Sequence, residues 1–222
     1  MDLTSYLLGK KAGGGGGASG PDWSTVGFES TPQTITVAYN KAKDIYDNWE
    51  VKTDYSSAYE NDSDIIIFPV VDLSSATNIT KMFQLAKCLV EVGDMNCSNV
   101  TYLSRVFNNC NVLRKIGEID CSSVTNADNY AFNYNDNLVY FGGLKDLGKA
   151  FPTSWSQDWF TLDLSKAPKL NHDSLINIIN KLYDIKAKGC NNQTLKLGST
   201  NLAKLTAEEI AIATAKGWNL TS

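Results

Sequence analysis

Polar and hydrophobic positions recur with a 24-residue period through the middle of the chain. Residues 72–78, 96–102 and 120–126 align without a gap, and each segment carries Asp or Asn first, Ser third and Thr sixth. The apolar positions with the same period are Phe68, Val92 and Ile116, then Val71, Met95 and Ile119, and then Phe83 and Phe107. A fixed period of this length with two apolar clusters per unit predicts a stack of similar units, a solenoid. Because solenoids mostly present binding surfaces, we expect recognition or assembly rather than catalysis.

The pattern within one unit predicts its local structure. Alternating apolar residues open the units at 65–71, 89–95 and 113–119, which predicts one short strand per unit in a parallel ladder. An Asp/Asn-x-Ser turn follows, because short polar side chains bond to nearby backbone groups. Residues 77–83 and their counterparts are then expected to form a short helical return. The inward side chains of the first return are Ile79, Met82 and Phe83.

Two polar columns run through the predicted stack. They consist of Ser74, Ser98 and Ser122, and of Thr77, Thr101 and Thr125. Since a catalytic serine would not be repeated three times in register, we expect both columns to form ladders of hydrogen bonds between units. Cys97 and Cys121 occupy the position of Leu73 in the first unit, which predicts small apolar core residues.

The period lengthens in the C-terminal part of the chain. A fourth unit begins at 138–144 after a single insertion, and the strand-like segments 161–164 and 194–197 have a 33-residue spacing. Between these two segments, residues 173–183 predict an amphipathic helix. Its inward side chains are expected to be Leu175, Ile178, Ile179 and Leu182.

A helix and a strand are predicted to close the chain. Thr206 and Glu209 are spaced as a capping box at the start of a helix that runs to Lys216. Gly217 is expected to end this helix, and residues 218–220 predict a last strand.

Residues 21–63 do not follow the repeat. Residues 34–37 alternate like a short strand, and residues 38–49 predict a helix. The side chains expected on one side of this helix are Ala42, Ile45, Tyr46 and Trp49. Because the end of a solenoid exposes an open core, we expect this segment to be an N-terminal cap, with Trp23 and Trp49 as plugs.

Residues 1–20 combine a short apolar peptide with a run of glycines. The apolar side chains of the peptide are Leu3, Tyr6 and Leu7 on one helical face, with Leu8 beside them. The run Gly13–Gly17 cannot bury side chains and loses much entropy on ordering, which predicts a flexible tether. We interpret residues 2–11 as an anchor peptide; a frayed terminus or a cloning linker is the alternative.

Composition and charge exclude several classes of partner. With 43% hydrophobic and 20% charged residues, the chain has the composition of an ordinary globular domain rather than a disordered one. A net charge of −4 argues against a nucleic-acid partner, whose phosphates favour a basic surface. No apolar run approaches the length of a spanning helix, and residues 1–11 lack the pattern of a secretory signal. We therefore expect synthesis in a cytoplasm and no membrane insertion.

Few residues in the chain favour catalysis or metal binding. Five cysteines without a CxxC pair and a single histidine, His172, predict no disulfide framework, metal site or cofactor. No Ser-His-Asp order, phosphate loop or HExxH spacing occurs, so we expect a protein that is not an enzyme. Asp158 and Asp163 flank aromatic residues as a glycosidase carboxylate pair could, but turn and strand-edge roles account for them more simply.

The repeat resembles that of a known family. Residues 72–83 and 96–107 share the pattern Asp/Asn-x-Ser-x-(Val/Ala)-Thr-x-(Met/Ile/Leu)-x-x-(Met/Val)-Phe. This pattern resembles the BspA-type leucine-rich repeats of bacterial surface proteins and of phages of gut and oral Gram-positive bacteria. The likeness covers about residues 64–144, and the segment from Leu195 onward resembles the closing part of the same proteins. It implies an α/β fold, a leucine-rich-repeat-like solenoid over residues 64–222 with one short parallel strand per 24–33-residue repeat and helical returns.

The N-terminus carries a second resemblance. Its sequence MDLTSYLLGKKAGGGG is similar to the opening of structural proteins encoded by phages and prophages of Firmicutes, where a short peptide and a glycine tether precede varied domains. The resemblance implies a virion protein of head or tail, anchored to other virion proteins through residues 2–11. It also implies a virion location and a homo-oligomer in the particle. A bacterial cell-surface adhesion protein related to BspA is the alternative, although such proteins carry secretion signals.

A ligand surface is expected near the irregular segment that follows residue 140. Tyr140, Trp155 and Trp159 could stack on sugars of a bacterial surface or of mucin, and insertions in solenoids often mark the binding face. The alternative is that these rings, together with Phe160, fill the joint between the 24-residue and 33-residue units.

Overall fold

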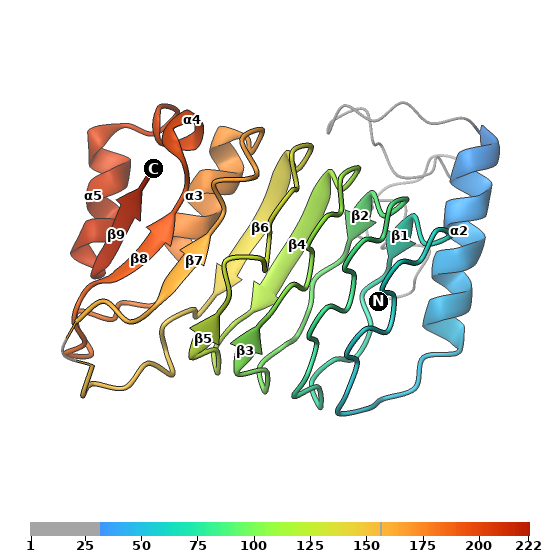
Figure 1. Ribbon diagram of the computed structural model, residues 1–222, viewed down its shortest axis with the longest axis horizontal. Coiled ribbons are helices and arrows are strands. Elements are labelled where there is room, and N and C mark those ends of the chain that lie inside the picture. Colours follow the sequence, from blue (N-terminus) through green and yellow to red (C-terminus); the bar gives the residue numbers. More distant parts are fainter. Residues whose placement is uncertain (1–31, 156) are drawn as a thin grey trace, which may run out of the picture.

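The computed structural model describes residues 32–155 and 157–222 as a mixed α/β arrangement of short parallel strands and helices (Figure 1). The largest sheet, here called the main sheet, consists in spatial order of β1 (Ile67–Phe68), β2 (Glu91–Val92), β4 (Lys115–Asp120) and β6 (Tyr140–Lys145). A second sheet pairs β3 (Tyr102–Leu103) with β5 (Asn126–Ala127). The third sheet contains β7 (Thr161–Asp163), β8 (Gln193–Lys196) and β9 (Trp218–Thr221).

Strand pairing in the main sheet follows the spacing of the sequence repeat. Ile67 pairs with Glu91 and Glu91 with Lys115, so each strand follows its neighbour by one full period of the sequence. Lys115 then pairs with Tyr140, one position beyond the next full period, which places the single insertion between these two strands. Every pairing is parallel, as the alternating apolar segments predict.

A ladder of aromatic rings crosses the core beneath the main sheet. Tyr59, Phe83, Phe107 and Phe132 stack one on the next, with ring centroids 5.7, 5.4 and 5.5 Å apart. The three phenylalanines are buried, and they come from equivalent places in successive units. Stacked rings of this kind bury a large apolar area and fix the spacing between neighbouring units.

The predicted helical returns are wrong for the 24-residue units. Residues 80–85 form turns in which Lys81 and Leu85 have φ angles of 59° and 62°. A right-handed helix cannot include such angles. The backbone instead bonds to the next unit, for example from the amide of Phe83 to the carbonyl of Val106 at 2.9 Å. The side chains predicted to face inward, those of Ile79, Met82 and Phe83, are all buried.

The two polar columns differ in what they bond. The hydroxyl of Thr77 donates to the carbonyl of Thr53 at 3.2 Å, and that of Thr125 donates to the carbonyl of Thr101 at 3.5 Å. The bond of Thr125 links two repeat units, as predicted, whereas that of Thr77 reaches Thr53 in the segment predicted as the cap. The serines bond within their own unit instead. Asp72 accepts hydrogen bonds from the side chain and the amide of Ser74, and both lower the pKa of Asp72.

Helix α2 (Pro32–Asp47) replaces the predicted strand at residues 34–37. The strand prediction is wrong because four alternating residues fit a helical turn equally well, and Pro32 has the φ angle that the first turn of a helix requires. The helix buries Ala38 and Ala42 against Ile67 of β1. It therefore covers the first strand of the main sheet.

Two aromatic residues of the predicted cap behave differently. Tyr46, expected to face inward, is 39% exposed. Trp49 stacks on Tyr55 with ring centroids 5.0 Å apart and also contacts Phe68 edge-on, so it helps to close this end of the core. Trp23, the other predicted plug, lies outside the described residues.

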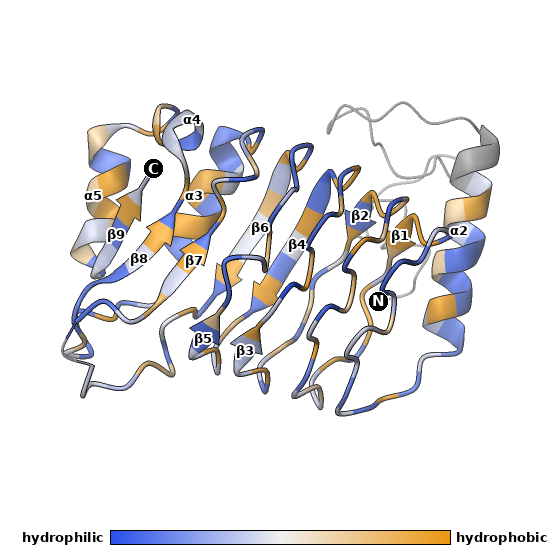
Figure 2. Ribbon diagram, in the orientation of Figure 1, coloured by the Kyte–Doolittle hydropathy of each residue, from blue (hydrophilic) through white to orange (hydrophobic). Residues whose placement is uncertain are grey.

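The C-terminal elements match their predictions closely. Thr161 pairs with Thr194, at the predicted 33-residue spacing. The four apolar side chains predicted to face inward from helix α3 (His172–Lys181) and its C-cap are all buried, and α4 (Ser199–Leu202) follows β8. Helix α5 (Ala207–Ala215) starts with the capping box of Thr206 and Glu209. In Figure 2 these strands and helices carry both apolar and polar residues along their length.

Lysine ammonium groups tie the longer units together. Nζ of Lys216 donates to the carbonyls of Ile179, Asn180 and Leu182 at 2.7–3.1 Å, just where α3 ends. Nζ of Lys204 donates to the carbonyls of Pro168 and Leu170. Burial lowers the pKa of both lysines. These bonds satisfy carbonyls that the ends of helices and loops leave without backbone partners.

Candidate functional site

The aromatic residues proposed as a ligand surface lie in different surroundings. Tyr140 begins β6 and lines a groove on the main sheet. Trp155 is half-buried and packs on Phe151, with ring centroids 5.0 Å apart. Trp159 is 61% exposed, while Phe160 beside it is buried. Trp155 and Phe160 thus fill the joint between units, and Tyr140 belongs to a separate site.

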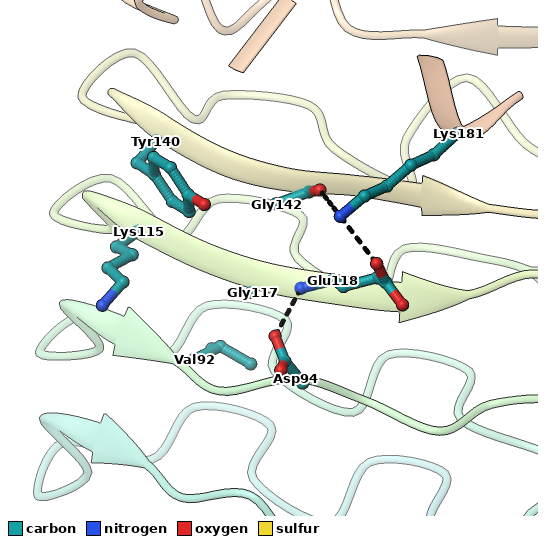
Figure 3. A pocket seen from close by; sticks show the side chains of 8 residues that line it. All are labelled: Val92, Asp94, Lys115, Gly117, Glu118, Tyr140, Gly142 and Lys181. Atoms are coloured by element: carbon teal, nitrogen blue, oxygen red, sulfur yellow. Dashed lines mark hydrogen bonds and ion pairs between the residues drawn. The ribbon is translucent and has the colours of Figure 1, made fainter. Parts of the chain in front are cut away.

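The groove that contains Tyr140, here called the sheet groove, lies on the main sheet and is lined mostly by polar and charged residues. It has a volume of about 310 Å³. Its lining residues are Val92, Asp94, Lys115, Gly117, Glu118, Tyr140, Gly142 and Lys181. They come from β2, β4, β6 and the end of α3, together with the turn after β2 (Figure 3).

Two helices flank the sheet groove. Ile67, Glu91, Lys115 and Tyr140 form one register row across the main sheet. Helix α2 covers Ile67 at the first end of this row. At the other end, α3 packs on β6, and Lys181 reaches the groove. The groove is therefore the part of this face that the two helices leave open.

Glycines form the floor of the sheet groove. A Cβ atom on Gly117 would lie 2.6 Å from the amide nitrogen of Asp94, and one on Gly142 would lie 2.6 Å from that of Glu118. Real side chains do not approach backbone atoms so closely, so both positions require glycine. The result is a strip without side chains across β4 and β6.

Ion pairs hold the charged walls of the groove. Lys115 pairs with the buried carboxylate of Glu91 at 2.7 Å. Lys181 pairs with Glu118 at 2.6 Å and donates to the carbonyl of Gly142 at 2.6 Å. Because each lysine already has an acidic partner, the walls are preorganised and carry little positive charge.

Asp94 is the exposed carboxylate of the site. One of its oxygens accepts the backbone N–H of Glu118 at 2.7 Å, which fixes the direction of the side chain. Figure 3 shows Tyr140 and Lys115 on one side of the glycine strip, with Asp94, Glu118 and Lys181 on the other. An aromatic ring and an ammonium group, those of Tyr140 and Lys115, thus lie across the glycine strip from the carboxylates of Asp94 and Glu118.

Sequence reasoning found Tyr140 but missed the rest of the sheet groove. The glycines at 93, 117 and 142 share one repeat position. This recurrence in the sequence could have indicated a strip without side chains on the sheet. Lys181 could not be found in this way, because it belongs to a helix outside the 24-residue units. The anchor residues Leu3, Tyr6, Leu7 and Leu8 lie outside the described residues.

A second groove lies at the N-terminal end, with a volume of about 480 Å³. Helix α2 and the turns after it line this groove, among them Trp49, Tyr55 and Tyr59. Burial raises the pKa of Tyr59 to about 12, so its hydroxyl stays protonated at neutral pH. The stacked rings of Trp49 and Tyr55 fill the end of the core, which makes this groove a part of the cap.

The other residues that could take part in a reaction have structural roles. Burial raises the pKa of the Cys97 and Cys110 thiols to about 12, which keeps them unreactive. Asp158 bonds to the hydroxyl of Thr194, and Asp163 pairs with Lys196, so these carboxylates do not share a site. Within residues 32–155 and 157–222, no group of three or more His, Cys, Asp or Glu residues could hold a metal ion.

Comparison of the chain with protein-family models, with curated proteins and with solved structures gave no match. Among the helices that the structure describes, none has the length and apolar character needed to cross a lipid bilayer. Arguments about function therefore depend on the geometry and on the sequence pattern.

Proposed function

We propose that the chain is a non-enzymatic structural protein of a bacteriophage virion that displays a leucine-rich-repeat-like solenoid for recognition. The observation that carries this proposal is the parallel register of the main sheet, in which strands separated by about one sequence period pair in chain order. In a solenoid each unit contacts its neighbours, and one face extends as units are added. Such an architecture supports the binding of a partner along that face.

The use of the repeated polar residues supports the same proposal. Thr77 and Thr125 bond to backbone carbonyls 24 residues before them in the sequence, and Asp72 and Asp120 bond to the amides of the turns that follow them. The threonines join segments one period apart, and the aspartates stabilise the turns of their own units. The charged and aromatic residues of the sheet groove remain available to a partner.

The virion part of the proposal rests on residues 2–11 and the glycine run behind them. An apolar peptide followed by a glycine-rich segment suits a domain that must be held at one point of a particle and still reach away from it. We propose that Leu3, Tyr6, Leu7 and Leu8 contact another virion protein in the head or the tail. Several copies in one symmetric particle would then present several grooves at once.

Cryo-electron microscopy and mass spectrometry of purified phage particles test this proposal. We expect the protein in the particle, with density for residues 2–11 against a capsid or tail protein, and we expect both to be lost when residues 1–20 are deleted. A Trp159→Ala variant is the matched control, because it removes an exposed ring without touching the anchor and should assemble normally. If particles contained the variant without residues 1–20 at the same copy number as the full-length protein, the proposed anchor would be wrong.

A bacterial cell-surface adhesion protein is the second candidate. The same repeat domain supports it, since recognition by the sheet groove does not depend on where the chain is attached. Fractionation of the host cells separates the two proposals. Protein found on the cell envelope and missing from particles would favour the adhesion protein.

A further inference from the structure

The sheet groove combines features that suit the two faces of a sugar, and we propose that it binds a single neutral pyranose residue of a surface glycan. This inference deepens the proposed recognition function and rests on it. It concerns what the groove binds, and it does not depend on how the chain is anchored.

Tyr140 provides the apolar side of the site. A pyranose carries C–H groups on its ring faces, which pack well on an aromatic ring, and its hydroxyl groups point outward from the edge. Tyr140 is half-buried at the start of β6 and packs with the apolar cluster that contains Ile67, which limits the movement of its ring. Partly exposed tyrosines offer an apolar surface together with a polar tip, and this combination suits an amphipathic ligand.

The glycine strip provides room beside this ring. Gly117 and Gly142 place no side chain between Tyr140 and the carboxylates across the floor (Figure 3). The volume of about 310 Å³ is at the lower end of the range of roughly 300–1,000 Å³ that is typical of small-molecule sites. One sugar ring fits such a space, whereas a longer piece of a chain would have to leave it along the surface.

Asp94 and Lys181 provide the polar side. A carboxylate has about four positions for accepting hydrogen bonds, and the amide of Glu118 occupies one position on Asp94. The remaining positions can accept two neighbouring hydroxyl groups. The ammonium group of Lys181 has three donors, and its bonds to Gly142 and Glu118 use two. The third can donate to a hydroxyl or ring oxygen.

The charge of the groove selects a neutral sugar. Asp94, Glu118 and Glu91 supply three carboxylates, whereas Lys115 and Lys181 supply two ammonium groups that are both already paired. A phosphate or a sialic acid would bring a further negative charge next to Asp94, and both lysines of the groove are already engaged by carboxylates. Like charges placed together cost binding free energy, so anionic sugars should be rejected.

Saturation-transfer NMR on the full chain tests the proposal with defined probes. The neutral probes are glucose, galactose, N-acetylglucosamine, N-acetylgalactosamine and rhamnose, and the anionic probes are N-acetylneuraminic acid and glucose 6-phosphate. We expect at least one neutral sugar to receive saturation on the C–H groups of one ring face. The anionic probes should show none. Absence of transfer to every neutral probe would overturn the proposal, as would transfer to the anionic probes alone.

Two variants connect the signal to the groove. Tyr140→Ala should abolish transfer, while Tyr102→Ala, which removes an exposed tyrosine from β3, should leave it unchanged. Asp94→Asn keeps the shape of an exposed side chain and removes its charge, so we expect at least tenfold weaker binding with an unchanged circular dichroism spectrum. Equal binding by Tyr140→Ala and the unaltered chain would also overturn the proposal.

Failure of this test can be told apart from failure of the proposed function. Particles that contain the protein through residues 2–11, but whose protein binds no sugar, would refute the sugar site and leave the virion role standing. Sugar binding by a protein that is missing from particles would do the reverse.

Discussion

Phe107 lies in the middle of the aromatic ladder, between Phe83 and Phe132, and it is fully buried. Replacing it with alanine would remove both stacking contacts and leave a cavity that the rigid units on either side cannot close. We expect Phe107→Ala to lower the free energy of unfolding by about 3–5 kcal/mol. Chemical denaturation followed by circular dichroism measures this change. Tyr102→Ala is the control, since an exposed ring should alter the stability by less than about 0.5 kcal/mol.

The five cysteines differ in burial, and this difference predicts their reactivity. Cys88 is exposed, whereas Cys97, Cys110, Cys121 and Cys190 are buried. Since the thiolate is the reactive form, the raised pKa values of the Cys97, Cys110 and Cys121 thiols protect them further. With a disulfide reagent at pH 8, we expect one thiol to react quickly in the native protein and all five after unfolding. Rapid loss of two or more thiols in the native protein would contradict this burial.

Asn135 is a buried polar residue with an unusual position. It is 0% exposed, and among the described residues neither Nδ2 nor Oδ1 of its side chain has a hydrogen-bond partner. In the preceding unit the equivalent residue is Cys110. We expect Asn135→Leu to raise the free energy of unfolding by about 1 kcal/mol, because it replaces an unsatisfied polar side chain with an apolar one of similar size. A lower stability would show that the amide is hydrogen-bonded in solution.

The sequence was informative about individual residues where the repeat was strict. Phe83 and Phe107 could be identified as core residues without a structure, because an apolar residue recurs at the same position of two successive repeats. Charged contacts were harder to predict. The pairing of Lys181 with Glu118 joins a helix to a strand far away in the sequence, and no local pattern connects them.

Among the elements, α5 combines a capping box with an ionisable group. Glu209 accepts the amide N–H of Thr206 and contacts His172, and these bonds lower its pKa below the usual 4.5. A depressed folded-state pKa means that the contribution of Glu209 is complete above about pH 4.5 and is lost as the pH falls through the lower value. The start of α5 should therefore loosen in acid.

Amide hydrogen exchange of the first turn of α5 can measure this effect. In the unaltered chain, protection should fall as the pH is lowered through the titration of Glu209, after correction for intrinsic rates. Glu209→Gln should remove this pH dependence. Thr206→Ala should lower the stability by about 1 kcal/mol at every pH, because it removes the cap itself. An identical pH profile in Glu209→Gln would show that another group is responsible.

Helix α2 illustrates why some elements could not be predicted. Residues 34–37 have the alternation of a strand, but they continue into a helical pattern that buries Ala38 and Ala42 on β1. The choice between the two structures is made by this tertiary contact. The turns at residues 80–85 are similar, because bonds between units hold them in a conformation that their own sequence does not favour.

At the scale of the whole molecule, the register of the main sheet predicts tolerance to the removal of one unit. Deletion of residues 96–119 would remove one full period and join Met95 to Asp120. Asp120 is the repeat equivalent of Asn96, so the order of repeat positions would be kept across the junction. We expect a folded, shorter protein with a cooperative thermal transition, because each unit contacts mainly its neighbours. Deletion of residues 96–107 is the control. It shifts the register by half a period and should give an unfolded chain by circular dichroism.

A cooperative half-period variant, or an unfolded full-period variant, would contradict the proposed solenoid. The broad arrangement of strands was predictable because a repeat constrains every unit at once. The C-terminal third could be predicted for a different reason, since the capping box and the amphipathic helix are strong local patterns. The position of α3 beside the sheet groove could not be predicted, because the chain makes that contact only after the repeat has ended.

The left-handed turn at Leu85 has equivalents in other units, at Asn61, Asn109 and Tyr134, with φ angles between 56° and 62°. Leucine and tyrosine adopt this conformation at a cost of about 1–2 kcal/mol, whereas glycine adopts it freely. Relief of this conformational cost at Leu85 and Tyr134 should therefore raise the thermal stability of the protein. Exchanging Leu85 and Tyr134 for glycine would let an engineer raise the melting temperature in two steps, away from the sheet groove.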